Sequence, residues 1–483
     1  MSKQRVIVVF LSLLLAATLL PRTASIAAPT PPRLELRFPS TEVHVYRSDR
    51  TGVVSLRLPV YLAAHDAPFD LRVRRDSYDD PLQIFQAVYD GADVSLTELP
   101  AEILDGWDGL VDFFRVRVYS EDDRLLRSVT ASACPSGYEQ QRLDDSGPYE
   151  STYPYGCRSW DFSLGSVWGI DTGWAVQPLW ASRARTELRE GTYRAVVSIT
   201  PRYRDLFGIA HDDAIAEASI VVGSVGCDFC GRAPSRGDRE RRADEQRRLT
   251  AAPIVDDPDP STLPDLVALP AFEIGIDRRR DREYLVFAAN VWNRGPASLV
   301  VEGFRREGEE TMDAYQYFID DGTIVGRSQV GTFVFDGRRG HHHWHFLQFA
   351  RYRLLDASLG HVVRSRKQSF CLFATDAVDL TVDGALWRED GFGYTQCGWD
   401  QSLWIREVLP TAWGDTYFQY VAGQSFEITD LPNGTYFVEV RANPQGLLFD
   451  ADPSNDTELR EIELGGVPGN RTVTVLPWHG IER

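Results

Sequence analysis

The chain has 483 residues, a formal net charge of −19 at pH 7 and 6 cysteines. This length is too great for one ordinary hydrophobic core, and it predicts two domains with connecting material. The acidic balance argues against a nucleic-acid partner, because binding to phosphate groups needs a basic surface.

Residues 1–28 have the pattern of a secretory signal peptide. Lys3 and Arg5 precede the apolar run VIVVFLSLLLAATLL, and small residues follow it from Ala24 to Ala28. The small residues favour cleavage over a retained membrane anchor, and no later run is long and apolar enough to span a bilayer. We therefore expect a secreted, extracellular protein with no membrane span after cleavage.

Two stretches of the remaining chain alternate apolar and polar residues in the manner of short strands. The runs VVSLRLPVYL and FFRVRVYS lie in the first stretch, and EYLVFAANVWN and YFVEVRANP lie in the second. The sequence therefore predicts an all-β fold with two β-sandwich-like domains, over residues 29–225 and 263–483. Residues 226–262 are rich in charge, Pro and Gly, and we expect them to form a linker.

The cysteines fall into pairs of near neighbours, as expected of disulfides in an exported protein. The pairs that proximity predicts are Cys134 with Cys157, Cys227 with Cys230, and Cys371 with Cys397. The second pair could instead be redox-active or half of a zinc site, although no further pair completes a zinc set.

Histidines are concentrated in the segment His341-His342-His343-Trp344-His345. In an extended segment His341, His343 and His345 share one face, and three imidazoles suit copper, zinc or nickel. Four residue steps span about 13 Å in a flat strand, so the segment must bend if all three are to bind one ion. The alternative is a histidine-rich loop that holds no metal.

Lysine is almost absent: it occurs only at Lys3 and Lys367, and every other basic residue is arginine. After signal cleavage Lys367 is the only lysine left. Arginine would serve for a surface charge or an ion pair, but it cannot supply an amine that loses its proton and attacks an electrophile. Lys367 is therefore a candidate nucleophile, and chance survival on a solvated loop is the alternative.

From Leu263 onward the sequence resembles the catalytic domain of the lysyl oxidase family. The segments that carry the resemblance occur in family order, and they are Leu263-Pro264-Asp265-Leu266, His341-His342-His343-Trp344-His345, Tyr352-Arg353-Leu354-Leu355-Asp356, Lys367-Gln368-Ser369-Phe370-Cys371, Asp415-Thr416-Tyr417, Glu427-Ile428-Thr429-Asp430 and Asn443-Pro444. Motifs in order over roughly 200 residues are far more specific than any one motif.

The resemblance implies a copper-dependent amine oxidase of the protein-lysine 6-oxidase type. Its copper ligands would be His341, His343 and His345, and its lysine tyrosylquinone cofactor would form from Lys367 and Tyr417. Such an enzyme converts a primary amine, either peptidyl lysine or a small amine, to an aldehyde with O2 and releases hydrogen peroxide and ammonia. The resemblance and the isolated lysine thus single out the same residue.

The resemblance also implies a calcium site near the end of the chain. Its ligands would be the side chains of Asp265, Asp450, Asp452, Asn455 and Asp456 and the backbone carbonyl of Leu266. Carboxylate and amide oxygens suit calcium. An Asp/Asn-rich turn without an ion is the alternative.

Arg351 stands where the family often has a histidine, so the resemblance does not predict which residue transfers protons.

Two other functions compete with the oxidase. The chain could be a non-catalytic secreted binding or adhesion protein with a structural metal at the histidines, a reading motivated by the first domain, where no catalytic motif is found. It could also be a zinc hydrolase.

Overall fold

The computed structural model describes residues 31–481 apart from internal gaps at 48–50, 52, 57, 91–92, 138, 145, 158, 180–184, 225–251, 306–309, 338–341, 348, 366, 368, 389–396 and 399–401. The signal peptide, Cys227, Cys230, His341 and most of the expected linker therefore lie outside the described residues. No helix within the described part of the chain is long and apolar enough to cross a membrane.

The described residues of the first half form three sheets. Their strands, in spatial order, are β1 (Arg33–Arg37), β4 (Tyr61–His65), β12 (Trp174–Val176) and β10 (Gln140–Arg142); then β11 (Gly165–Ile170), β5 (Phe69–Arg74), β6 (Gln83–Asp90) and β7 (Asp93–Leu99); then β13 (Arg185–Glu187), β3 (Val53–Ser55), β2 (Glu42–Arg47), β15 (Ile215–Ser224), β14 (Gly191–Ile199), β8 (Leu110–Tyr119) and β9 (Leu125–Ala133). Side chains alternate between the two faces of a strand, and on β14 this places Ala195, Val197 and Ile199 together in the hydrophobic core. The described helices here are α1 (Pro201–Phe207) and the short η1 (Ala101–Ile103).

Three further sheets are formed by the part of the second half that the structure describes. Their strands are β16 (Leu266–Ala268), β18 (Arg282–Asn293), β27 (Trp413–Tyr417) and β25 (Asp376–Ala377), with β17 (Phe272–Arg279) and β28 (Ser425–Glu427) also paired to β18; then β22 (His343–Phe346), β21 (Thr323–Asp336), β20 (Thr311–Asp320), β19 (Leu299–Arg305) and β26 (Trp404–Leu409); then β24 (His361–Arg364), β23 (Ala350–Asp356), β29 (Gly434–Ala442), β30 (Thr457–Val467) and β31 (Asn470–Val475). The predicted all-β fold is confirmed.

The end of the expected linker lies against the second half. Val255 donates its backbone N–H to the carbonyl of Arg327 on β21 over 3.0 Å, and the 3-10 helix η2 (Pro260–Thr262) follows. Gly326 approaches Val255 closely enough that a side-chain carbon there would lie 2.5 Å from the valine. The chain thus enters the second half along the sheet that also carries β22.

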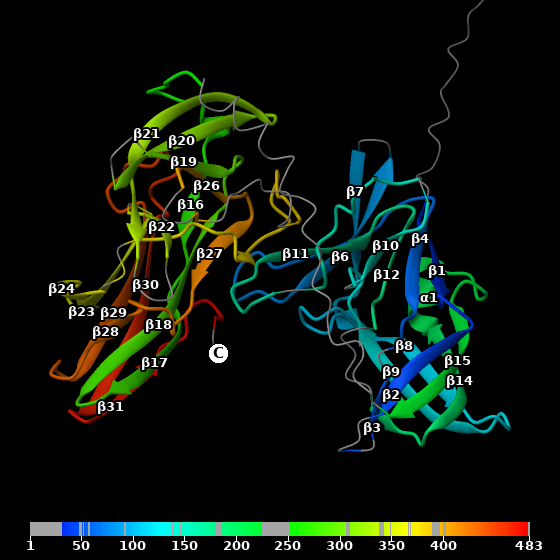
Figure 1. Cartoon of the computed structure of the whole chain (residues 1–483). Coiled ribbons are helices and arrows are strands. Elements are labelled where there is room, and N and C mark those ends of the chain that lie inside the picture. Colours follow the sequence, from blue (N-terminus) through cyan, green and yellow to red (C-terminus); the bar gives the residue numbers. More distant parts are fainter. Residues whose placement is uncertain are drawn as a thin grey trace, which may run out of the picture.

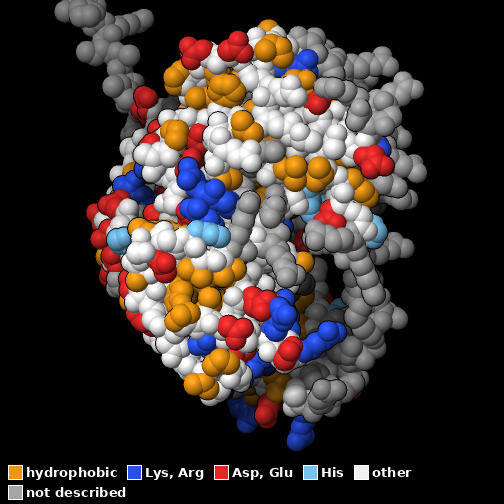
Figure 2. All heavy atoms as spheres, turned by 90° about the vertical axis from the view of Figure 1, so that its left-hand side faces the viewer, with side chains coloured by type: hydrophobic (Ala, Val, Ile, Leu, Met, Phe, Trp, Pro, Cys, Tyr) orange, Lys and Arg blue, Asp and Glu red, His pale blue; other side chains and the backbone are white. Residues whose placement is uncertain are grey.

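The two halves are in contact through the loop after β25. Strand β11 reaches toward the second half in Figure 1, and Leu164 just before it donates its N–H to the carbonyl of Val378 over 2.7 Å. Leu380 in turn donates to the carbonyl of Gly165 over 3.0 Å. Tyr153 and Val167 of the first half are buried in the same hydrophobic cluster as the core of the second half. Figure 2 looks onto the second half and shows acidic, basic and hydrophobic side chains interspersed over the described surface.

Candidate functional site

Strand β22 presents two histidines from one face. The Nε2 atoms of His343 and His345 lie 2.8 Å apart, and His345 is 2% exposed. His342, just before the strand, has a φ of 50°, which is the left-handed backbone that non-glycine residues rarely adopt. This supplies a bend of the kind that the histidine spacing requires. His341 lies outside the described residues.

The other ring nitrogen of His345 faces oxygen atoms. Its Nδ1 lies 2.9 Å from Ser369 Oγ and 3.7 Å from Asp336 Oδ2. Partners of this kind at one nitrogen fix the tautomer and leave the Nε2 lone pair for a metal. Two imidazole nitrogens that converge in this way fit a divalent transition metal such as copper.

The segment around Lys367 lies beside β22. Phe346 and Phe370 exchange both backbone hydrogen bonds, at 2.7 and 2.9 Å, so this segment pairs antiparallel with the end of the histidine strand. Ser369, the hydrogen-bond partner of His345, belongs to the same segment. The pairing therefore brings the segment that carries Lys367 next to the histidine strand.

Lys367 and Tyr417 meet although they lie far apart in the sequence. Lys367 is 7% exposed, and its Nζ lies 4.0 Å from the centre of the Tyr417 ring. The Phe370 ring packs edge-on against the Tyr417 ring at 5.2 Å and also faces the Lys367 ammonium at 4.9 Å. Tyr417 donates its hydroxyl to the carbonyl of Cys371 over 2.7 Å, which fixes the ring in place.

Asp415 completes this buried group. It precedes Tyr417 by two positions on β27, so both side chains lie on one face of the strand. Burial raises the pKa of the Asp415 carboxyl well above its usual value, and the nearby Lys367 lowers it in part. Burial likewise raises the pKa of the Tyr417 hydroxyl, and Asp415 raises it further. Asp415 Oδ2 has no hydrogen-bond partner among the described atoms.

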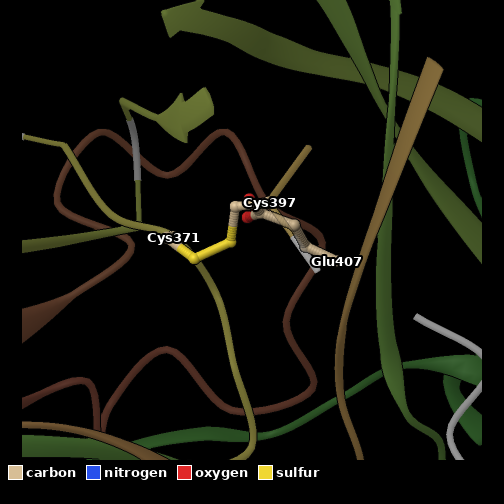
Figure 3. A group of neighbouring side chains, drawn as sticks. All are labelled: Cys371, Cys397 and Glu407. Atoms are coloured by element: carbon tan, nitrogen blue, oxygen red, sulfur yellow. A yellow bond between two sulfur atoms is a disulfide. The ribbon is translucent and has the colours of Figure 1, made fainter. Parts of the chain in front are cut away.

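A second buried carboxyl, Glu407 on β26, lies next to the Cys371–Cys397 disulfide (Figure 3). These residues form the one group of three or more His, Cys, Asp or Glu ligand atoms within 4.8 Å of one another in the described part of the chain, and both sulfur atoms are committed to the disulfide. Glu407 accepts a hydrogen bond from the N–H of Leu372 over 2.9 Å. The predicted Cys134–Cys157 and Cys371–Cys397 disulfides are confirmed.

The acidic residues near the end of the chain meet the start of the second half. Asn455 donates to Asp265 Oδ1 over 2.8 Å, and the N–H of Leu266 donates to Asp450 Oδ1 over 3.2 Å. Burial raises the pKa of Asp450 to about 6 and that of Asp456 to about 8, and neighbouring carboxylates contribute.

Three oxygens of this group have no hydrogen-bond partner among the described atoms: Asp450 Oδ2, Asn455 Oδ1 and Asp456 Oδ1. Buried oxygens in this state fit a cation, and their type suits calcium. Asp452 differs, because it is exposed and its carboxylate accepts hydrogen bonds from Ser454.

Asp415, Ser369 and Phe370 were not predicted as site residues. Asp415 could have been predicted from the sequence. In the motif Asp415-Thr416-Tyr417, side chains two positions apart on a strand lie on the same face, so Asp415 and Tyr417 are neighbours. Ser369 and Phe370 reach the site through the Phe346–Phe370 pairing, and no local pattern indicates that pairing.

The second half is an all-β domain in which His343 lies beside His345, and Lys367 lies beside the ring of Tyr417. Residues 327–469 match the model of the lysyl oxidase family. The chain is 33% identical to lysyl oxidase homolog 1 from Homo sapiens over 129 residues. The matched region is 26% of this chain and 20% of the human protein. Lysyl oxidase homolog 1 from Bos taurus is also 33% identical over 129 residues. Here the matched region is 26% of this chain and 19% of the bovine protein. The chain thus spans about a fifth of these relatives, and it carries a C-terminal domain of the lysyl oxidase family.

Proposed function

We propose that the protein is a secreted copper-dependent amine oxidase whose quinone cofactor is built from Lys367 and Tyr417. The observation that carries the proposal is the 4.0 Å approach of Lys367 Nζ to the Tyr417 ring. The substrates are a primary amine and O2, and the products are an aldehyde, hydrogen peroxide and ammonia. His343 and His345, with His341, would hold copper, and bound copper would supply the oxidation of the Tyr417 ring by O2.

The residues around the lysine prepare it for addition to that ring. A nucleophilic amine must be neutral, and arginine in its place would remain charged. Asp415 lies close enough to influence the lysine electrostatically, and its Oδ2 has no hydrogen-bond partner in the described structure. We assign to Asp415 the acceptance of the proton that leaves Lys367 Nζ, because burial favours a neutral amine and carboxylic acid over two charges.

The hydroxyl of Tyr417 and the ring of Phe370 keep the Tyr417 ring and the Lys367 side chain in position for the addition. The hydrogen bond to the Cys371 carbonyl fixes the Tyr417 ring in its plane, while Phe370 supports both the ring and the lysine. The Cys371–Cys397 disulfide anchors the segment that carries Lys367. Preorganisation of this kind reduces the entropic cost of bringing the reacting atoms together.

Calcium is the second ion of the proposal, held by Asp265, the carbonyl of Leu266, Asp450, Asn455 and Asp456, with Asp452 at the exposed edge. It would neutralise the carboxylates that join the start of the second half to the turn before β30. Its role would be structural, because these residues belong to a different part of the domain from the lysine and tyrosine.

Activity of purified protein tests the proposal. Protein produced with copper should redox-cycle in a quinone stain and release hydrogen peroxide with a primary amine, and Lys367→Arg and Tyr417→Phe should do neither. Tyr436→Phe is the matched control, because Tyr436 also donates its hydroxyl to a backbone carbonyl, that of Pro432 over 2.8 Å. An inactive, well-folded wild-type protein with copper bound would favour a binding module with a structural metal, and zinc-dependent hydrolysis would favour a hydrolase.

A further inference from the structure

A small pocket of about 150 Å³ lies in the first half, where β8 and β14 run side by side (Figure 1). Its ionisable lining residues are all basic, and they are Arg115, Arg117, Arg204 and His211. No aspartate or glutamate is among the described residues that line it. A pocket of this kind is unexpected in a chain whose formal net charge is −19, so its basic residues call for a specific cause.

Arg115 and Arg117 reach the pocket from one strand. They are two positions apart on β8, so both lie on the same face of the sheet, about 7 Å apart along the strand. Val116 between them is buried on the opposite face. On β14 the residues in register with the two arginines are Ser198 and Val196, whose short side chains leave room beside the guanidinium groups.

The two arginines have no ion-pair partner in the described part of the chain. Arg194 on β14 shows the contrasting arrangement, because it binds Asp123 over 2.9 Å and Glu217 over 2.9 Å. Both pocket arginines are half-buried, and each keeps a positive charge that no described carboxylate neutralises. An anion from outside the chain would supply the missing negative charge.

Arg204 and His211 form the other wall, from helix α1 and from the turn between α1 and β15. Arg204 Nη1 lies 2.6 Å from His211 Nδ1. A guanidinium group can only donate, so Nδ1 accepts this hydrogen bond and the proton of the neutral imidazole is on Nε2. The remaining N–H groups of Arg204 and the Nε2–H of His211 are further donors for an anion.

We propose that this pocket binds a phosphate or sulfate group. Guanidinium groups bind the oxygens of such groups through paired N–H donors, and three of them favour a doubly charged group over a single carboxylate. The small volume and the net charge of −19 favour one compact group over a long polyanion, which the rest of the chain would repel. None of the pocket residues takes part in the proposed oxidation, so the inference does not depend on the oxidase function.

Isothermal calorimetry of the full chain with inorganic phosphate at constant ionic strength tests the pocket. We expect saturable binding at one site, and Arg117→Gln should weaken it about tenfold or more, because charge-assisted hydrogen bonds are lost. Arg127→Gln is the matched control, since it removes the same charge from an exposed position of β9 in the same sheet, outside the pocket, and should keep the wild-type affinity. Arg204→Gln removes donors from the other wall, and its weaker binding keeps the test valid if Arg117→Gln fails to fold.

Two further probes, sulfate and glucose 6-phosphate, identify the source of the group. Tighter binding of glucose 6-phosphate than of inorganic phosphate would support a site for a phosphate ester, whereas equal or weaker binding would support a site for the free ion. The proposal would be overturned if the wild-type protein showed no saturable binding of any of the three probes. It would also be overturned if Arg127→Gln lost as much affinity as Arg117→Gln, because the binding would then follow the overall charge of the sheet.

Discussion

Gly423 lies directly against the backbone of Lys367. A side-chain carbon at Gly423 would lie 2.9 Å from the backbone nitrogen of Lys367 and 3.0 Å from its Cβ, and Gly423 has a φ of +92°. The carbonyl of Gly423 accepts a hydrogen bond from Ser365, whose Oγ in turn accepts the N–H of Lys367 over 3.1 Å. Lys367 is therefore positioned by a loop that follows Tyr417, which ties the two reacting residues together.

Replacement of this glycine should displace the lysine. We expect Gly423→Ala to lower the free energy of unfolding by about 2–4 kcal/mol and to abolish quinone staining, because both the backbone conformation and the contact are lost. Gly469→Ala is the control, since Gly469 has a similar φ of +85° but open space around it. That variant should lose only about 1 kcal/mol and keep its stain. A normal stain in Gly423→Ala would contradict the assigned geometry.

Asp415→Asn should slow formation of the quinone. An amide cannot accept the lysine's proton, so we expect the stain to develop about 100-fold more slowly after copper is added to metal-free protein. Asp171→Asn replaces another buried aspartate, one that is bound to Ser151 and Thr152 in the first half, and should leave the rate unchanged. Equal rates in wild type and Asp415→Asn would mean that another group takes the proton.

Glu407 should make the fold less stable as the pH rises. Burial raises the pKa of its carboxyl well above the usual value, although the N–H of Leu372 lowers it in part. The folded state therefore keeps a proton that the unfolded chain releases near pH 4, so the stability that this proton contributes is present below about pH 4 and is lost as the pH rises through the folded pKa. We expect the free energy of unfolding, measured with urea, to fall between about pH 5 and 8. This fall should be smaller for Glu407→Gln than for wild type.

Glu283 supplies the opposite case. Burial tends to raise the pKa of its carboxyl, but hydrogen bonds from Arg471, Gly469 and Arg278 lower it overall. Its contribution is lost only as the pH falls through that lowered pKa, so Glu283→Gln should reduce stability by the same amount at about pH 5 and 8. An identical pH slope in wild type and Glu407→Gln would contradict the raised pKa of Glu407, because the folded and unfolded states would then release its proton over the same pH range.

Removal of calcium should destabilise the second half. A free calcium concentration of about 100 times the Kd stabilises a fold by about 2.7 kcal/mol, so we expect EGTA to lower the Tm by about 5–10 °C. Asp456→Asn should abolish the response. Asp356→Asn, at the end of β23 where Asp356 accepts hydrogen bonds from Ser358, should retain it. If the Tm does not change with calcium, the calcium site is contradicted, and these residues form an acidic turn that holds no ion.

The sequence predicted what is local and left out what depends on packing between distant segments. Period-two alternation predicted strands such as β14 and β29, and the spacing of His343 and His345 predicted their shared face. The scarcity of lysine singled out Lys367, but not its contact with Phe370. The pocket lined by Arg117 and Arg204 could not be predicted, because it forms only where β8 and β14 meet helix α1 and the turn that follows it.

Peptide mass spectrometry of copper-loaded protein tests the central claim most directly. Proteolysis should yield a single branched peptide in which the side chains of Lys367 and Tyr417 are covalently joined, and the Lys367→Arg variant should yield the two linear peptides instead. Recovery of unmodified Lys367 and Tyr417 peptides from folded wild-type protein with copper bound would contradict the account.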